Sequence, residues 1–320
     1  MLDKFRLANF KIDVVAENEL ILPEYKGSTI RGIFGHAFKR VACIKSSSEN
    51  CSDCSLKERC PYNYVFNTPV PTDAEIMRKY NYAPHPYILC PPLESTQSYP
   101  PGAKMHYFIT IVGDALNFLP YFVLSFEAMG KLGLGKNKGK YQLKSISALA
   151  KKETWQEIYN SANKQLMKSY PIFQMNDLAI AKPVELLTLR FLTPVRIKYD
   201  GKIVGDKASD SKRLEFHILM RNLLRRIGLL SYFHCGEELN IDYRHMINEA
   251  QSIKITEEKL EWYDWGRYSH RQEQGIGMGG LIGEISYEGK IKDFLPFIRI
   301  GEFVHVGKST AFGMGKYTVK

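Results

Sequence analysis

The feature that most constrains the fold is an internal repeat that closes each half of the 320-residue chain. Residues 118–146 and 294–320 both begin Phe-Leu-Pro and continue through an apolar segment of helical length. Both then pass through clustered glycines and lysines into Gly-Lys-Tyr and a short alternating segment, which has the period of a β-strand. The pattern predicts one supersecondary plan used twice, each time with a basic glycine-rich loop.

The segments before each repeat copy extend this plan to a whole domain. Alternation predicts strands at residues 5–15, 86–90 and 105–112, and an apolar stripe at helical spacing predicts a helix over 28–41. The second half has the same order, with a strand at 184–198 broken by Pro194, a helix at 207–230 and strands at 253–267 and 280–288. The order β-α-β-β-α-β is the ferredoxin-like plan. We therefore predict an α+β protein of two tandem ferredoxin-like (RRM-like) domains.

A chain of this length favours two domains of ordinary size. We place the first at residues 1–150, with a cysteine-rich insertion at 43–64, and the second at 183–320, with the glycine-rich loop. Residues 151–182 are mixed in charge and are predicted to form a helical linker.

Composition narrows the class of protein. Hydrophobic residues make up 44% and charged residues 24%, which is typical of a soluble globular protein. No apolar run approaches the roughly twenty residues of a membrane span, and the first residues carry no signal-peptide core. We expect a cytoplasmic protein with no membrane partner.

The charge balance points to a polyanionic partner. The net charge is +10 and the isoelectric point is about 9.1, which favours nucleic acid. Lys136 and Lys138 lie in the first glycine-rich loop without an intervening acid, so we count them as candidate RNA contacts. The alternative is an ordinary solvated face.

Two segments match nucleotide-binding motifs only in part. The triplet Gly307-Lys308-Ser309 resembles the end of a P-loop, but Glu302 stands where that motif needs a glycine, and strand-like residues follow. Residues 275–280 satisfy the dinucleotide pattern but precede a strand-like run where a helix is needed. Nucleotide binding through either motif is not expected.

Four of the six cysteines lie close together in the chain: Cys43, Cys51, Cys54 and Cys60. The inner pair is C-x-x-C, a spacing that offers two thiolates to one metal ion. In a cytoplasmic protein, metal binding is favoured over disulfides. A structural zinc is our first interpretation, an iron–sulfur cluster the alternative and unligated thiols the third. The metal would stabilise the folded form of a loop that is too polar to fold by itself.

Two histidines are candidates for acid–base chemistry. His36 and Lys39 are three residues apart on the predicted first helix and so share one face, and nearby cations favour a neutral imidazole that suits a general base. His305 precedes the Gly307 loop, where backbone N–H groups could hold a phosphate. Tyr25 could orient a hydroxyl, or be a plain surface aromatic. For His36 the alternative is an ordinary, partly buried histidine.

One more segment mixes hydrogen-bond donors with aromatic rings. Residues 268–272 read Tyr-Ser-His-Arg-Gln, and Arg271 is its cation. Such a mixture suits a surface for single-stranded RNA.

Three motifs together resemble one known family. They are Arg-Gly-x-x-Gly-His at residues 31–36, Cys-Pro-Tyr at 60–62 and the loop from His305 to Gly315. The sequence resembles the CRISPR repeat-processing endoribonucleases of the RAMP superfamily, specifically those with the repeat-associated C-terminal domain. The resemblance covers almost the whole chain, and its loop is the most specific part.

The resemblance implies tandem ferredoxin-like domains that bind CRISPR repeat RNA and cut precursor CRISPR RNA once per repeat, without a catalytic metal. The ribose 2′-hydroxyl attacks the adjacent phosphate and leaves a 2′,3′-cyclic phosphate, which requires a general base, a general acid and cations. His36 matches the family's first-helix histidine, while Tyr25 and Lys39 match by neighbourhood only. His305 could also face the RNA. The implied RNA-binding loop contains Gly307, Lys308, Gly313, Gly315 and Lys316.

Two further functions compete with the endoribonuclease. The first is a non-catalytic RAMP subunit that holds guide RNA among the subunits of a CRISPR effector complex. The second is a metal-dependent nuclease, which needs clustered carboxylates that this chain does not offer at a convincing spacing.

Overall fold

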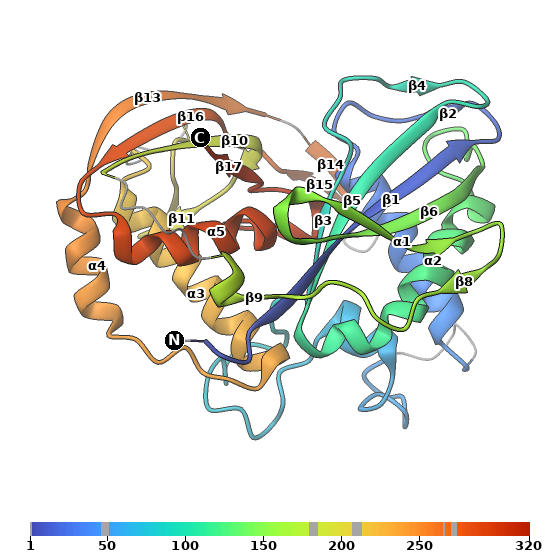
Figure 1. The fold of residues 1–320 in the computed structure, drawn as a ribbon, viewed down its shortest axis with the longest axis horizontal. Coiled ribbons are helices and arrows are strands. Elements are labelled where there is room, and N and C mark those ends of the chain that lie inside the picture. The colour runs from blue at the N-terminus through green and yellow to red at the C-terminus, as the bar shows by residue number, and fades with distance from the viewer. Residues whose placement is uncertain (1, 46–50, 179–184, 207–212, 265, 270–273) are drawn as a thin grey trace. The chain divides into compact units, whose positions relative to one another are not determined.

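The computed structural model describes residues 2–45, 51–178, 185–206, 213–264, 266–269 and 274–320 (Figure 1). The chain forms two compact units. The N-terminal unit contains Phe5–Phe173 together with Phe233–Gly236, and the C-terminal unit contains Met1–Lys4, Gln174–Tyr232 and Glu237–Lys320.

The N-terminal unit is built on an antiparallel sheet. Its central strands have the order β3-β5-β1-β6, which is the strand order 2-3-1-4 of a ferredoxin-like domain. β1 alternates between buried and less buried side chains, so one face of the sheet meets the core. The strands are β1 (Arg6–Ala16), β3 (Tyr87–Cys90), β5 (Lys104–Val112) and β6 (Tyr141–Leu149), and β2 (Leu20–Ile21) pairs with β4 (Ser98–Tyr99) outside this sheet.

Two helices, α1 (Gly27–Ala42) and α2 (Leu119–Leu132), pack side by side on one face of this sheet (Figure 1). Their apolar stripes bury aromatic rings between them. The ring of Phe34 stacks on that of Phe126 at 5.3 Å and meets the ring of Phe122 at 5.7 Å. Each such ring buries roughly 150–250 Å², so this cluster is a main source of stability for the unit.

The predicted helical linker at 151–182 is wrong. Its described residues form β7 (Trp155–Asn160), β8 (Gln165–Leu166), β9 (Phe173–Gln174) and the short 3-10 turns Lys151–Glu153 and Met175–Leu178. β7 pairs with the outer edge of β6 and buries Ile158 and Tyr159. Pairing to an open sheet edge overrides a composition that favours helix, because tertiary contacts outweigh intrinsic propensity. The last part of that prediction, 179–182, lies outside the described residues.

The C-terminal unit repeats the plan. Its sheet has the order β13-β16-β10-β17, again 2-3-1-4. The strands are β10 (Leu186–Val195), β13 (Lys254–Tyr263), β16 (Gly280–Glu288) and β17 (Tyr317–Val319). The helices are α3 (Phe216–Cys235), α4 (Tyr243–Ser252) and α5 (Leu295–Val304), and two hairpins pair β11 (Lys198–Tyr199) with β12 (Lys202–Ile203) and β14 (Gly266–Ser269) with β15 (Gln274–Gly277). The predicted tandem ferredoxin-like fold is confirmed. Helix α4 was not predicted, and residues 207–212 of the expected third helix lie outside the described part of the chain.

The two repeat copies share one packing device. Tyr141 donates its hydroxyl proton to the Phe126 carbonyl of α2 at 2.9 Å, and Tyr317 donates to the Ile298 carbonyl of α5 at 2.6 Å. In both helices a glycine makes room for this tyrosine. A Cβ on Gly130 would lie 2.1 Å from the Tyr141 carbonyl oxygen, and one on Gly301 would lie 1.9 Å from the Tyr317 hydroxyl.

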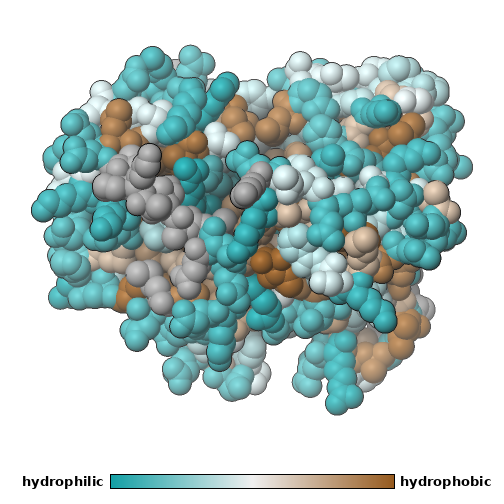
Figure 2. Space-filling view, viewed as in Figure 1, coloured by the Kyte–Doolittle hydropathy of each residue, from teal (hydrophilic) through white to brown (hydrophobic). Residues whose placement is uncertain are grey.

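Hydrophilic residues cover most of the face of the molecule seen in Figure 2. Among the described residues, no helix has the length and apolar character needed to cross a membrane.

Candidate functional site

Helix α1 presents His36 on its outer face. The opposite face buries Ile30, Phe34 and Phe38, and this spacing fixes which side of the helix meets solvent. His36 is exposed, so its imidazole can reach a bound ligand. Arg40, one turn further on, is also exposed and lies in the last turn, where a cation is favoured by the helix dipole.

Gly32 and Gly35 lie inside this helix before His36, and they differ in their surroundings. A Cβ on Gly35 would lie 3.3 Å from the ring of Phe66, so this glycine serves close packing. A Cβ on Gly32 would meet no heavy atom within 4 Å. Glycine inside a helix costs about 1 kcal/mol relative to alanine, and no packing contact of this fold explains it at position 32. Gly32 lies one turn before His36, so it keeps the surface beside this histidine open.

Lys39 and Tyr25 are the other residues predicted to act beside His36. Lys39 holds its ammonium group over the ring of Tyr62, 5.9 Å from the ring centre. Tyr25 precedes the helix, and the rise along the helix axis from Gly27 to His36 is about 14 Å.

Lys26, beside Tyr25, is a buried charge that the sequence analysis did not single out. Its side chain is 0% exposed, and Nζ donates to the carbonyl oxygens of Glu94 at 2.7 Å and Glu24 at 3.2 Å. Burial lowers the pKa of Lys26, while the nearby Glu94 and Glu24 carboxylates oppose that shift. The lysine anchors the connector before α1. No sequence pattern marks it, because the carbonyls it binds come from backbone.

The C-terminal glycine-rich loop is anchored by residues of β10 that lie at an irregularity in the strand pairing. The pairing of β10 with β16 shifts between Phe191 and Val195, which frees Thr193 and Pro194 for other partners. The Thr193 hydroxyl donates to the Gly313 carbonyl at 2.7 Å, and the Gly315 N–H donates to the Pro194 carbonyl at 2.9 Å.

The loop's shape requires its glycines. Gly307, Gly313 and Gly315 have φ values of 88°, 90° and 74°, in the left-handed region that glycine tolerates best. Gly313 and Gly315 are buried.

Several backbone donors of the loop are used inside the protein. The N–H groups of Lys308, Gly313 and Gly315 donate to the carbonyls of Arg196, Thr310 and Pro194. These donors do not form the phosphate cradle that the sequence suggested. The side chain of Lys308 is exposed on this loop.

His305 lies inside the C-terminal unit, with 2% of its surface exposed. Its Nδ1 lies 3.1 Å from the Met314 carbonyl. Burial lowers its pKa well below the usual value, and the charges of Lys316 and Arg226 add to that shift. A ring held this way cannot reach a substrate, so the structure does not support a catalytic role for His305.

Lys316 was predicted to bind RNA, but its ammonium group binds a carbonyl oxygen at the C-terminal end of α5. Its Nζ donates to the Glu302 carbonyl at 2.5 Å and lies 6.0 Å from the ring centre of Phe303. The Nε of Arg226 donates to the Val304 carbonyl at 2.7 Å. Both cations satisfy carbonyls in the last turn of the helix, where positive charge is stabilising.

The first glycine-rich loop exposes the predicted lysines Lys136 and Lys138. Asn137 anchors the loop, because its side-chain amide donates to the Glu19 carbonyl at 2.6 Å and its oxygen accepts from the Ile21 N–H at 3.2 Å. The lysines are thus held at the surface by a rigid turn. The remaining predicted contact, Arg271, lies outside the described residues.

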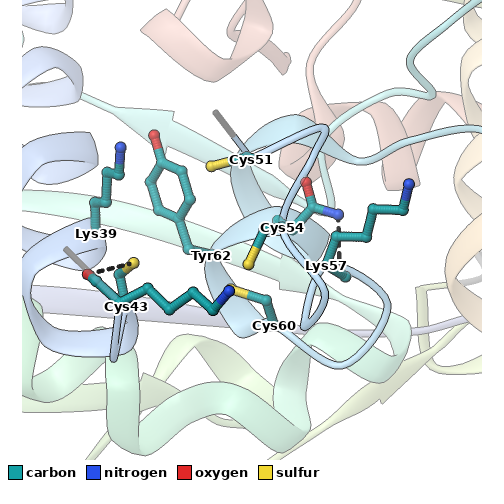
Figure 3. A pocket seen from close by; sticks show the side chains of 9 residues that line it. Lys39, Cys43, Cys51, Cys54, Lys57, Cys60 and Tyr62 are labelled. Atoms are coloured by element: carbon teal, nitrogen blue, oxygen red, sulfur yellow. Dashed lines mark hydrogen bonds between the residues drawn. The ribbon is translucent and has the colours of Figure 1, made fainter. Parts of the chain in front are cut away.

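The four clustered cysteines line one pocket (Figure 3). Lys39, Lys45, Lys57, Tyr62 and Asn63 complete its lining. The four pocket cysteines are free thiols, and the Cys43 Sγ lies 3.4 Å from the Lys45 carbonyl. In the described residues no three His, Cys, Asp or Glu side chains are already arranged to hold a metal ion.

Two family models match the chain. Residues 5–171 match AF_1859_N, described as an N-terminal domain, and residues 189–317 match CRISPR_Cas6, described as CRISPR-associated endoribonuclease Cas6. An uncharacterized protein of Archaeoglobus fulgidus is 24% identical over 311 residues, which cover 93% of each chain.

Solved structures with the same fold span the full chain. A Cas6 product complex matches with a TM-score of 0.58 and 16% identity, over 98% of this chain and 100% of that chain. Thermus thermophilus Cas6 matches with a TM-score of 0.54 and 14% identity, over 99% of both chains. Both repeat the fold described above, and the Cas6 model covers the C-terminal sheet and loop. Residues 189–317 therefore belong to the CRISPR-associated endoribonuclease Cas6 family, and the whole chain has the fold of the solved Cas6 structures.

Proposed function

We propose that this protein is an endoribonuclease that binds CRISPR repeat RNA and cuts precursor CRISPR RNA within each repeat. Family membership supports a role in CRISPR RNA processing or binding. The observation that carries the catalytic proposal is the exposed His36 on an open, basic face of α1, with Gly32 one turn before it and Arg40 one turn after it.

In the proposed reaction, the neutral imidazole of His36 accepts the proton of the ribose 2′-hydroxyl. The 2′-oxygen then bonds to the adjacent phosphorus as the bond to the 5′-oxygen breaks. The leaving oxygen takes up a proton from solvent, to which the His36 imidazolium returns its own. The products are a 2′,3′-cyclic phosphate and a 5′-hydroxyl, and no metal is required. The exposed Arg40, four residues further along the helix, stabilises the charge that develops on the phosphate.

Binding in this proposal comes from exposed lysines on rigid loops. Lys308 in one loop and Lys136 and Lys138 in the other contact phosphates, so affinity depends on salt. The loops hold their backbone shape through internal hydrogen bonds and bring the lysines to the RNA with little loss of conformational entropy.

Partners beyond RNA are part of the same proposal. A Cas6-RT-Cas1–Cas2 complex contains a region with this fold, with a TM-score of 0.58 and 12% identity over 100% of this chain and 47% of that chain. We include proteins of the CRISPR machinery among the expected partners.

The test is cleavage of a CRISPR repeat RNA by the full-length protein in EDTA, beside the same RNA with a deoxyribose at the cut site. Cutting that persists in EDTA and vanishes with the deoxy substrate supports the proposed chemistry. Tight binding without cutting would instead identify a non-catalytic subunit that holds guide RNA. Cutting that EDTA abolishes would indicate a metal-dependent nuclease.

His36→Ala tests the assigned base. We expect cleavage to fall by at least a hundredfold while RNA affinity stays within about threefold, because one neutral ring adds little to a phosphate-dominated interface. The control is His245→Ala, since His245 is exposed on α4. Equal loss of binding and cleavage on His36→Ala would refute the catalytic assignment.

A further inference from the structure

We propose that Cys43, Cys51, Cys54 and Cys60 bind one zinc ion, which holds their segment against helix α1. The four side chains line one pocket although they come from three places in the chain (Figure 3). Cys43 caps the end of α1, Cys51 and Cys54 flank one turn, and Cys60 directly precedes the next helical segment. Four thiolates without another donor form the closed set typical of structural zinc.

The segment has no apolar core of its own. Among its described residues, 44–45 and 51–61, none is buried, and burial resumes at Asn63. Hydrogen bonds within its described residues join near neighbours in the chain. The Lys57 N–H donates to the Cys54 carbonyl at 3.1 Å, and the Asn63 side chain donates to the Lys57 carbonyl at 2.8 Å.

Each such bond contributes only about 0.5–1.5 kcal/mol, whereas ordering one residue costs about 1–2 kcal/mol. A metal ion supplies the missing stabilisation, because binding energy at a structural zinc site becomes folding energy.

The remaining cysteines provide an internal contrast. Cys90 and Cys235 are buried and lie outside the pocket, as expected of cysteines that pack as small apolar groups. The four pocket cysteines are partly exposed, so an ion from solution can reach them. They are free thiols not yet arranged as a ligand set, and the proposal requires the loosely held turn to close on the ion.

Charge in the pocket fits this assignment. Zinc with four thiolates carries a net charge of about −2, which needs nearby cations in a partly buried site. Lys39, Lys45 and Lys57 line the same pocket, and no acidic side chain is among its lining residues.

The site adjoins the helix that carries His36. Tyr62 lies under the Lys39 ammonium group and stacks on Phe66 at 5.2 Å with an interplanar angle of 14°. Phe66 in turn is the ring against which Gly35 packs. Loss of zinc is therefore expected to disturb the position of α1 and to lower cleavage indirectly.

The experiment measures zinc and iron in the full-length protein by mass spectrometry and records its visible absorbance. We expect one zinc per chain in the wild type, loss of zinc in Cys54→Ser and Cys51→Ser, and retention in the control Cys90→Ala. A folded wild type without zinc, or zinc retained in Cys54→Ser, would overturn the proposal. Iron with visible absorbance would replace zinc by an iron–sulfur cluster and so also overturn it.

A second measurement does not depend on how the variants fold. The wild type, stripped of metal, is titrated with Co²⁺, and proteolysis of the segment between Cys43 and Cys60 is followed. We expect the intense visible bands of tetrahedral thiolate cobalt and protection of the segment at one equivalent. No bands and no protection would contradict a four-thiolate site. Neither readout uses RNA, so the zinc proposal and the endoribonuclease proposal fail independently.

Discussion

Replacing Gly32 with alanine separates what α1 needs for stability from what its surface needs for RNA. Gly32 lies inside the helix and has ordinary helical φ, so alanine fits without backbone strain. Its new Cβ would meet no heavy atom within 4 Å, so no steric cost opposes the change. Alanine exceeds glycine in helix propensity by about 0.8–1.0 kcal/mol. For a unit of this size, that gain raises Tm by about 2–4 °C.

The same methyl group is expected to impair the reaction. It would stand one turn from His36, on the surface that we propose the RNA backbone approaches. Displacing a phosphate by about 1 Å can reduce a rate by up to a hundredfold. We expect the single-turnover cleavage rate of Gly32→Ala to fall by at least tenfold, a loss of about 1.4 kcal/mol or more in transition-state stabilisation.

Gly35→Ala is the matched control on the same helix. Its Cβ would press on the Phe66 ring at 3.3 Å, so the propensity gain is offset by repacking and no rise in Tm is expected. Thermal melts and single-turnover cleavage are measured on both variants. If Gly32→Ala raises Tm and cleaves at the wild-type rate, the open surface has no part in RNA approach. If it lowers Tm, the added methyl group does meet a contact that opposes the change.

Three further predictions concern the C-terminal unit. Lys308→Ala should weaken RNA binding and reduce the slope of log K against log salt by about 0.7–0.9. The control Lys292→Ala, in the turn that precedes α5, should leave the slope unchanged. Equal slopes in the two variants would mean that Lys308 does not contact the RNA. Because folding lowers the pKa of His305, the unfolded chain binds the extra proton, and His305 therefore reduces stability below about pH 6.5 by up to 1.4 kcal/mol per pH unit. Urea unfolding at pH 7, 6 and 5 should show a shallower pH dependence of stability in His305→Gln than in the wild type. An unchanged dependence would mean that this ring is protonated in the folded protein. Gly315→Ala should destabilise the C-terminal unit by about 2–4 kcal/mol, because φ at this position is 74° and the alanine Cβ would lie 1.9 Å from the Val306 carbonyl oxygen. A variant with the Tm of the wild type would show that the loop rearranges freely.

The repeated plan was predictable because its signals are local. Phe-Leu-Pro starts a helix, since proline is tolerated in the first turn, and proline is found there in both α2 and α5. Clustered glycines then mark a loop with left-handed residues, and Gly-Lys-Tyr opens a strand. Each signal depends on a few neighbouring residues, so the sequence alone was enough to predict the tandem fold.

The errors arise where tertiary contacts decide. Nothing local in Trp155–Asn160 shows that the edge of β6 is open to pair with it. Helix α4 did carry a usable signal, because Asp242 caps it by accepting the His245 N–H at 2.9 Å and Ile247 and Ala250 form its buried face. Ten residues are too few for periodicity to stand out without attention to that cap.

The choice between the two histidines shows the limit of motif reasoning most clearly. His305 sits beside the loop that carries the family resemblance, and His36 lies on a helix far away in sequence. Burial separates the two histidines where the motif could not, because His305 is 2% exposed and hydrogen-bonded to the Met314 carbonyl. Its φ of 59° is unfavourable for a residue with a side chain, and surrounding contacts must hold it there. A general base must instead reach the hydroxyl that it deprotonates, and of the two only His36 is exposed on its element.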